Sequence, residues 1–78
     1  MRTKELKLVI TFHTTAEAIA METLCRKEDI PGRLIPVPRQ ISAGCGLSWS
    51  MPAGWRDRMM EILGGQGIGY QTIGEYVI

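Results

Sequence analysis

The sequence predicts an α+β fold in which a four-stranded antiparallel sheet carries two helices on one face, in the element order βαββαβ. Apolar runs rich in Leu, Val and Ile alternate with stretches of helical spacing, and prolines and glycines separate these elements. No repeat or low-complexity segment interrupts the order. This arrangement is that of the ferredoxin-like split sandwich.

The first elements are a strand and a helix. Residues 6–12 form an almost continuous apolar run, which is typical of a central strand. Thr14 and Glu17 then have the spacing of a capping box, so a helix is expected to begin there and to continue to about Lys27 or Glu28. Residues 29–32 end it, because proline cannot continue a helix and glycine permits a turn.

Two strands are expected next, joined by a long loop. Residues 32–37 predict the second strand, and Pro36 places it at a sheet edge or at the end of the strand, since proline cannot donate to a ladder. Residues 47–51 alternate apolar side chains with serines, which predicts a half-buried third strand with its hydroxyls on the open face.

A second helix and a fourth strand complete the chain. Pro52 suits the first turn of a helix, Gly64-Gly65 is expected to end that helix, and Gly67 to turn the chain. A final strand lies within residues 68–78. The apolar stripe of this helix is expected to consist of Trp55, Met59, Ile62 and Leu63, with Met60 outside it.

Size and charge predict a single folded domain over residues 1–78. Hydrophobic residues make up 45% and charged residues 22%, as in ordinary soluble proteins. A net charge of +1 provides no field that would recruit nucleic acid or a membrane surface, and the apolar runs are too short to span a bilayer. We expect a cytoplasmic protein whose partners recognise it locally.

The two cysteines have different surroundings. Cys25 lies at helical spacing from Ala18 and Met21, which predicts a small core residue. Cys45 lies in the long loop between two glycines, Gly44 and Gly46, whose backbone freedom would present its sulfur. A buried, structural role for Cys45 is the alternative.

The predicted topology brings candidate site residues to one edge of the sheet. His13 and Thr14, between the first strand and the first helix, are expected at the same edge as Arg39 and Cys45. A thiolate there could be stabilised by the Arg39 guanidinium, by the positive end of the helix and by the loop amides from Gly44 to Gly46. His13 could activate the thiol, or could simply be a boundary residue, and Arg39 could be a solvated surface cation. A single histidine and the absence of Cys-x-x-Cys argue against a metal site within one chain.

Several of these residues form a recognisable pattern. Ile41-Ser42-Ala43-Gly44-Cys45-Gly46-Leu47, the preceding Pro38-Arg39 and the Phe12-His13-Thr14-Thr15 segment resemble the small bacterial domains described as selenium or sulfur carrier-like proteins, over about residues 7–77. The resemblance implies a cytosolic carrier in which Cys45 is the family's cysteine and Arg39, Ser42 and Gly46 belong to its surrounding motif. The chain departs at Gly32, where a branched residue is common.

Three functions follow from this pattern as hypotheses. In the first, Cys45 holds a sulfane sulfur or selenium atom as a persulfide-type adduct, without a cofactor, and passes it from a donor such as a cysteine desulfurase to an acceptor enzyme. In the second, the chain is a protein-interaction or regulatory module, and Cys45 is structural. In the third and weakest, a Cys45 pair in a homo-oligomer transfers a metal with help from His13.

Overall fold

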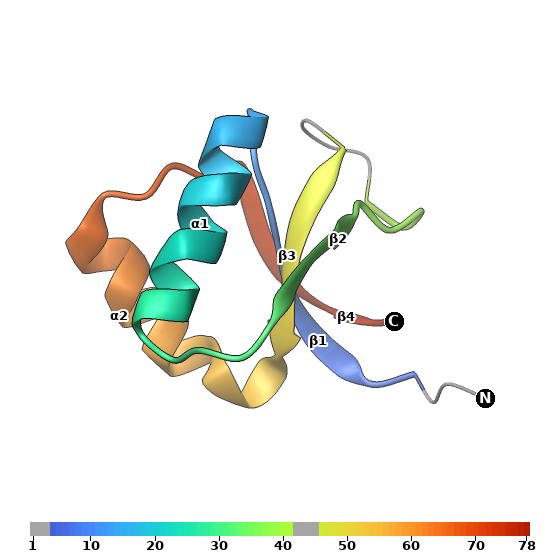
Figure 1. The fold of residues 1–78 in the computed structure, drawn as a ribbon. Coiled ribbons are helices and arrows are strands. Elements are labelled where there is room, and N and C mark those ends of the chain that lie inside the picture. The colour runs from blue at the N-terminus through green and yellow to red at the C-terminus, as the bar shows by residue number, and fades with distance from the viewer. Residues whose placement is uncertain (1–3, 42–45) are drawn as a thin grey trace.

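The computed structural model describes residues 4–41 and 46–78 and has the predicted α+β arrangement (Figure 1). Four antiparallel strands form one sheet, and two helices lie on the same side of it. The elements in chain order are β1 (Leu6–Thr11), α1 (Thr15–Lys27), β2 (Arg33–Pro36), β3 (Leu47–Pro52), a 3-10 turn η1 (Ala53–Trp55), α2 (Arg56–Gln66) and β4 (Thr72–Val77). Within the described ranges, neither helix has the length and apolar character needed to cross a bilayer.

The strands are arranged in the order β2-β3-β1-β4, as a ferredoxin-like split sandwich requires. β1 is central and its Leu8, Val9 and Ile10 are buried, which confirms the interpretation of its continuous apolar run. β2 is an edge strand that ends at Pro36, also as predicted. The proline therefore costs no ladder hydrogen bond inside the sheet.

The hydrophobic core lies between the sheet and the two helices. Every second residue of the central strands points into it, because side chains alternate between the two faces of a strand. α1 and α2 each contribute one apolar face. The sheet supplies Leu8, Ile10, Trp49 and Met51, α1 supplies Ala18, Met21, Leu24 and Cys25, and α2 supplies Met59 and Ile62.

The second helix begins later than predicted. Pro52 ends β3 in an extended conformation with ψ 136°, and the η1 turn separates it from Arg56, the first residue of α2. A proline φ near −60° fits both a helix start and an extended strand, so the residue type does not distinguish them. Trp55 consequently lies on the turn and is 37% exposed, outside the buried stripe in which it was predicted. Met60 is exposed, as predicted.

The helix also ends later than predicted. α2 continues through Gly64 and Gly65 to residue 66 and is capped by Gly67, which takes a left-handed φ of 68°. A glycine ends a helix when its backbone leaves the right-handed region, and only Gly67 does so here.

The open face of β3 differs from its prediction as well. Ser48 and Ser50 are buried, although they point away from the helices. Both lie in a central strand between larger neighbours, since Ser48 pairs with Ile35 and Ser50 with Val9. The alternating pattern identified the two faces correctly but did not show that neighbouring strands shield the small hydroxyls.

Candidate functional site at the loop end of the sheet

Three connections meet at one end of the sheet, which we call the loop end. They are the β1–α1, β2–β3 and α2–β4 connections (Figure 1). The strand register shows this directly, because Thr11, the last residue of β1, lies opposite both Ser48 at the start of β3 and Thr72 at the start of β4. The predicted meeting of the β1–α1 and β2–β3 connections at one end of the sheet is therefore confirmed for the described residues.

The β2–β3 loop is closed at its base. The Val37 amide donates a hydrogen bond to the Gly46 carbonyl at 3.0 Å, and the Ile41 amide donates to the Pro38 carbonyl at 2.9 Å. The second bond forms a tight turn that places the exposed Arg39 at its corner. Ser42, Gly44 and Cys45 lie outside the described residues.

Position 46 requires a glycine because of its backbone conformation and not because a side chain would be crowded there. Its φ is 91°, a value that side chains with a Cβ rarely adopt. A Cβ at this position would meet no atom within 4 Å. The expected backbone freedom of this glycine is thus used in the loop.

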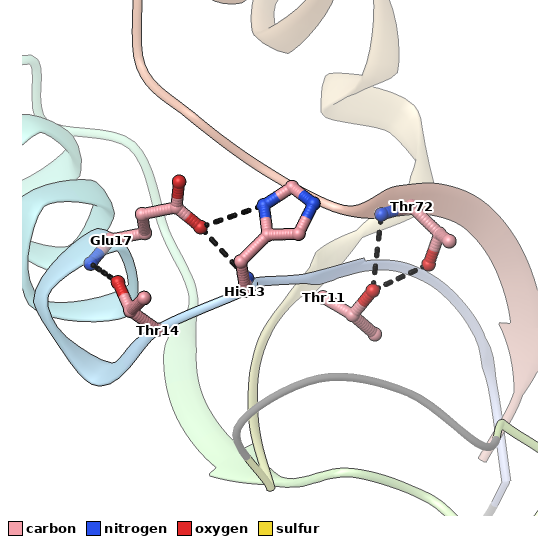
Figure 2. Close-up of polar contacts among 5 residues, drawn as sticks. All are labelled: Thr11, His13, Thr14, Glu17 and Thr72. Atoms are coloured by element: carbon pink, nitrogen blue, oxygen red, sulfur yellow. Dashed lines mark hydrogen bonds and ion pairs between the residues drawn. The ribbon is translucent and has the colours of Figure 1, made fainter.

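The start of α1 is held by a modified capping box, which Figure 2 shows. The Thr14 hydroxyl accepts a hydrogen bond from the Glu17 amide at 3.2 Å, as predicted. The Glu17 carboxylate reaches back to the His13 amide at 2.7 Å rather than to the cap residue itself, and the same oxygen lies 3.2 Å from His13 Nδ1. The imidazole is thereby oriented by the first turn of the helix.

The Glu17 carboxylate changes the electrostatics of the helix start. The His13 backbone hydrogen bond, with smaller contributions from the His13 ring and the Thr14 amide, lowers the pKa of Glu17 despite partial burial. The positive end of α1 thus carries a carboxylate that stays ionised at neutral pH. This charge opposes any stabilisation of an anion by the helix start, which was predicted as one source of positive potential.

Removing the Glu17 charge should make the stability of the fold change less with pH in the acid range. The folded pKa lies below its usual 4.5, so the stabilisation is present above 4.5 and is lost as the pH falls through the folded value. We expect Glu17→Gln to lower the melting temperature at neutral pH and to match the wild type in strong acid. Thermal melts at pH values between strong acid and neutral measure this difference in melting temperature. Glu22→Gln, which removes another carboxylate further along α1, is the control. If Glu17→Gln lowered the melting temperature by the same amount at every pH, the stabilisation would not come from the Glu17 charge.

The third connection packs against the same corner. A Cβ at Gly69, in the α2–β4 connection, would collide with the Glu17 carboxylate. Close by, the consecutive amides of Gln71 and Thr72 both donate to Thr11, at 2.7 Å to its carbonyl and 3.1 Å to its hydroxyl. Thr11 therefore holds the start of β4 through both its backbone carbonyl and its side chain. Sequence reasoning missed Thr11 and Thr72; the signal was a hydroxyl residue within an apolar strand.

The structure brings some of the predicted site residues into contact and others only to the same end of the sheet. His13 and Thr14 are joined through Glu17. Arg39 and Gly46 belong to the neighbouring loop, and Arg39 makes no ion pair with any described residue. Across residues 4–41 and 46–78, no cluster of three or more His, Cys, Asp and Glu side chains could hold a metal ion.

Cys25 is a core residue, as predicted. It is fully buried, and its Sγ lies 3.7 Å from Met21 Sδ. Burial raises the pKa of the Cys25 thiol to about 11. Since the thiolate is the reactive form, this residue is unsuited to nucleophilic chemistry at neutral pH.

Comparison with known proteins yields one family. The sequence model of the family described as "Putative Se/S carrier protein-like" matches residues 7–75, which includes the whole loop from Pro38 to Leu47. No curated protein and no solved structure matches the chain.

Proposed function

Because the chain belongs to the Se/S carrier-like family, we propose that it carries a sulfane sulfur or selenium atom on Cys45 and delivers it to a partner enzyme. The observation that carries this proposal is the family match, which spans the loop between β2 and β3 and includes its glycine-flanked cysteine. The buried position of Cys25 supports the assignment, because it leaves Cys45 as the candidate thiol.

The transfer needs no net oxidation. The Cys45 thiol loses its proton, and the thiolate attacks the outer sulfur of a persulfide on the donor, such as a cysteine desulfurase. A new S–S bond forms on Cys45 while the donor's S–S bond breaks and its cysteine leaves as a thiolate. An acceptor nucleophile then attacks the outer sulfur and releases the Cys45 thiolate. A selenium atom would follow the same sequence.

The described part of the loop end suits a site that a second protein must reach. Arg39 is exposed on a tight turn and has no anionic partner among the described residues, so its charge is available to an anionic adduct or to the partner. His13 is 58% exposed in its side chain, and Glu17 fixes its ring through Nδ1. Its other nitrogen is left for a proton or a partner group.

Intact-mass measurement tests the proposal. After incubation with a cysteine desulfurase and either cysteine or selenocysteine, the wild type and Cys25→Ser should gain the mass of one sulfur or one selenium atom. Cys45→Ser should gain none. If no chalcogen is added to wild-type protein whose Cys45 still reacts with an alkylating reagent, the carrier function is wrong.

The competing function, an interaction module with a structural Cys45, also has an observation in its favour. The sheet face away from the helices carries a hollow of about 570 Å³ whose lining includes Lys7, Arg33, Ile35 and Ser50. If that face binds the physiological partner, Arg33→Glu should weaken the complex and Cys45→Ala should leave it intact. If the chain is a carrier, Cys45→Ala should abolish delivery of the chalcogen, and Arg33→Glu should affect that delivery much less.

A further inference from the structure

The sheet face away from the helices is hollowed beside β2. Val9 and Ser50 point to this face and are 1% and 9% exposed, although both helices lie on the other side of the sheet (Figure 1). Side chains on an uncovered sheet face usually contact water. Their burial shows that larger neighbours rise around them, and the short serines of β3 leave the centre of the face low.

Two hollows in this face join into one groove. The first is the hollow of about 570 Å³ that extends from β1 to β2, and the second, of about 450 Å³, continues along β2 toward the loop end. They share three lining residues: Arg33, Ile35 and Ile78. All four prolines of the chain line one hollow or the other, namely Pro31, Pro36, Pro38 and Pro52. We call the two hollows together the β2 groove.

Arg33 is the uncompensated charge of the β2 groove. It is exposed and lines both hollows, and no carboxylate of the described residues, including that of Ile78, forms an ion pair with it. The other cation, Lys7, is paired with Glu5 at 3.0 Å. A guanidinium can bind a carboxylate through two parallel hydrogen bonds. The groove therefore has one place for an anionic group.

Apolar side chains lie on both sides of that place. Met51 and Pro52 line the first hollow, and Leu34 and Pro36 line the second. A proline ring offers no amide donor, so side-chain contacts rather than a backbone ladder would hold an occupant here. The groove thus fits a carboxylate that has apolar groups before and after it.

We propose that the β2 groove binds an extended segment of another protein in which one Asp or Glu lies between apolar residues. The carboxylate pairs with Arg33, and the neighbouring side chains fill the two hollows. The groove follows the chain from Pro31 to Pro38. An extended segment rises about 3.3 Å per residue, so about seven residues cover this length. A compact small molecule would fill only one of the two hollows.

This binding site does not depend on the chemistry of Cys45. The groove begins beside Pro31, at the opposite end of β2 from the loop, and Arg33 is the first residue of that strand. The bound segment attaches the chain to another protein, while a chalcogen donor or acceptor approaches the loop end. The inference therefore goes beyond the carrier function and stands with or without it.

Selection from a random peptide library tests the preferred sequence. Phage-displayed peptides of about seven residues are selected on the full-length wild type, and the enriched sequences should carry an Asp or Glu between apolar residues. The enriched peptide is then synthesised, and its Kd is measured by fluorescence anisotropy. Replacing its acidic residue with the corresponding amide should weaken binding about fivefold, as expected for an exposed ion pair. No enrichment, or enriched peptides without an acidic residue, would overturn the proposal.

Two matched variants locate the bound peptide. Arg33→Glu places a carboxylate opposite the peptide's own and should weaken binding at least about tenfold. A peptide with Lys in place of its acidic residue should bind Arg33→Glu more tightly than it binds the wild type. Arg26→Glu makes the same change in net charge at an exposed position on α1 and should bind as the wild type does. Circular dichroism confirms that both variants are folded. Equal losses in the two variants would show that the peptide does not bind at Arg33.

Discussion

In the native protein at neutral pH, Cys45 should be alkylated at least about a hundredfold faster than Cys25. Burial raises the pKa of Cys25 to about 11, so very little of it is thiolate, and its side chain is fully buried. An ordinary cysteine has a pKa of about 8.5 and therefore a far larger thiolate fraction. Time courses with iodoacetamide, followed by peptide mass spectrometry, measure both rates. Similar rates would mean that Cys45 is as inaccessible as Cys25.

The pKa of Cys45 tests activation more stringently than this ratio does, because the burial of Cys25 alone produces a large difference. A carrier thiol stabilised by Arg39 should titrate below about 8.5. Arg39→Gln should raise that pKa by only ~0.5 unit, since water and salt screen an exposed charge. Arg33→Gln, an exposed arginine at the other end of β2, is the control. A Cys45 that titrates at or above the ordinary value would remove the physical basis of activation.

Replacing Gly32 with alanine should cost about 3 kcal/mol of folding free energy, from backbone strain and overpacking together. Its φ of 145° is rarely adopted by residues with a Cβ, and a Cβ there would lie 2.7 Å from both the Ser50 carbonyl oxygen and the Trp49 ring. Neither neighbour can move easily, because one is backbone in a central strand and the other is a buried indole. Urea denaturation measures the loss.

Gly54→Ala is the matched control for this substitution. Gly54 lies in η1, and a Cβ there would meet no atom within 4 Å. We expect its stability to stay within about 0.5 kcal/mol of the wild type, as for most surface substitutions. A loss below about 1 kcal/mol for Gly32→Ala would show that the β2–β3 edge adjusts more readily than its packing indicates. The Trp49 ring occupies the space of the branched residue that the family resemblance leads one to expect at position 32.

The element order was predictable because each element has a strong local signal. The continuous apolar run of β1 and the proline at the end of β2 even indicated which strand is central and which lies at an edge. The boundaries of α2 were not predictable in the same way. Pro52 and Gly64 are compatible with two backbone conformations each, and packing rather than residue type selects between them.

The site was predictable as a location but less so as a set of contacts. Topology alone placed His13, Thr14 and Arg39 at one end of the sheet. The reach of Glu17 past the cap residue to His13 depends on the chain path into α1, which no spacing rule specifies. Likewise, the two hydrogen bonds to Thr11 depend on the register of β1 against β4. Thr11 and Thr72 are 61 residues apart in the sequence, so no local pattern specifies that register.

The strand order also determines when the sheet can form during synthesis. β1 and β2 are not neighbours, because β3 lies between them. A nascent chain that has emerged only through β2 can form α1 but no native strand pair, and the apolar segment from Leu8 to Ile10 has no partner strand. Pairing begins when β3 leaves the ribosome, and β1 acquires its second neighbour only with β4, the last element in the chain. The fold is therefore dominated by contacts distant in sequence, so the sheet should be completed only once β4 has emerged, with the central strand as the segment that chaperones would protect until then.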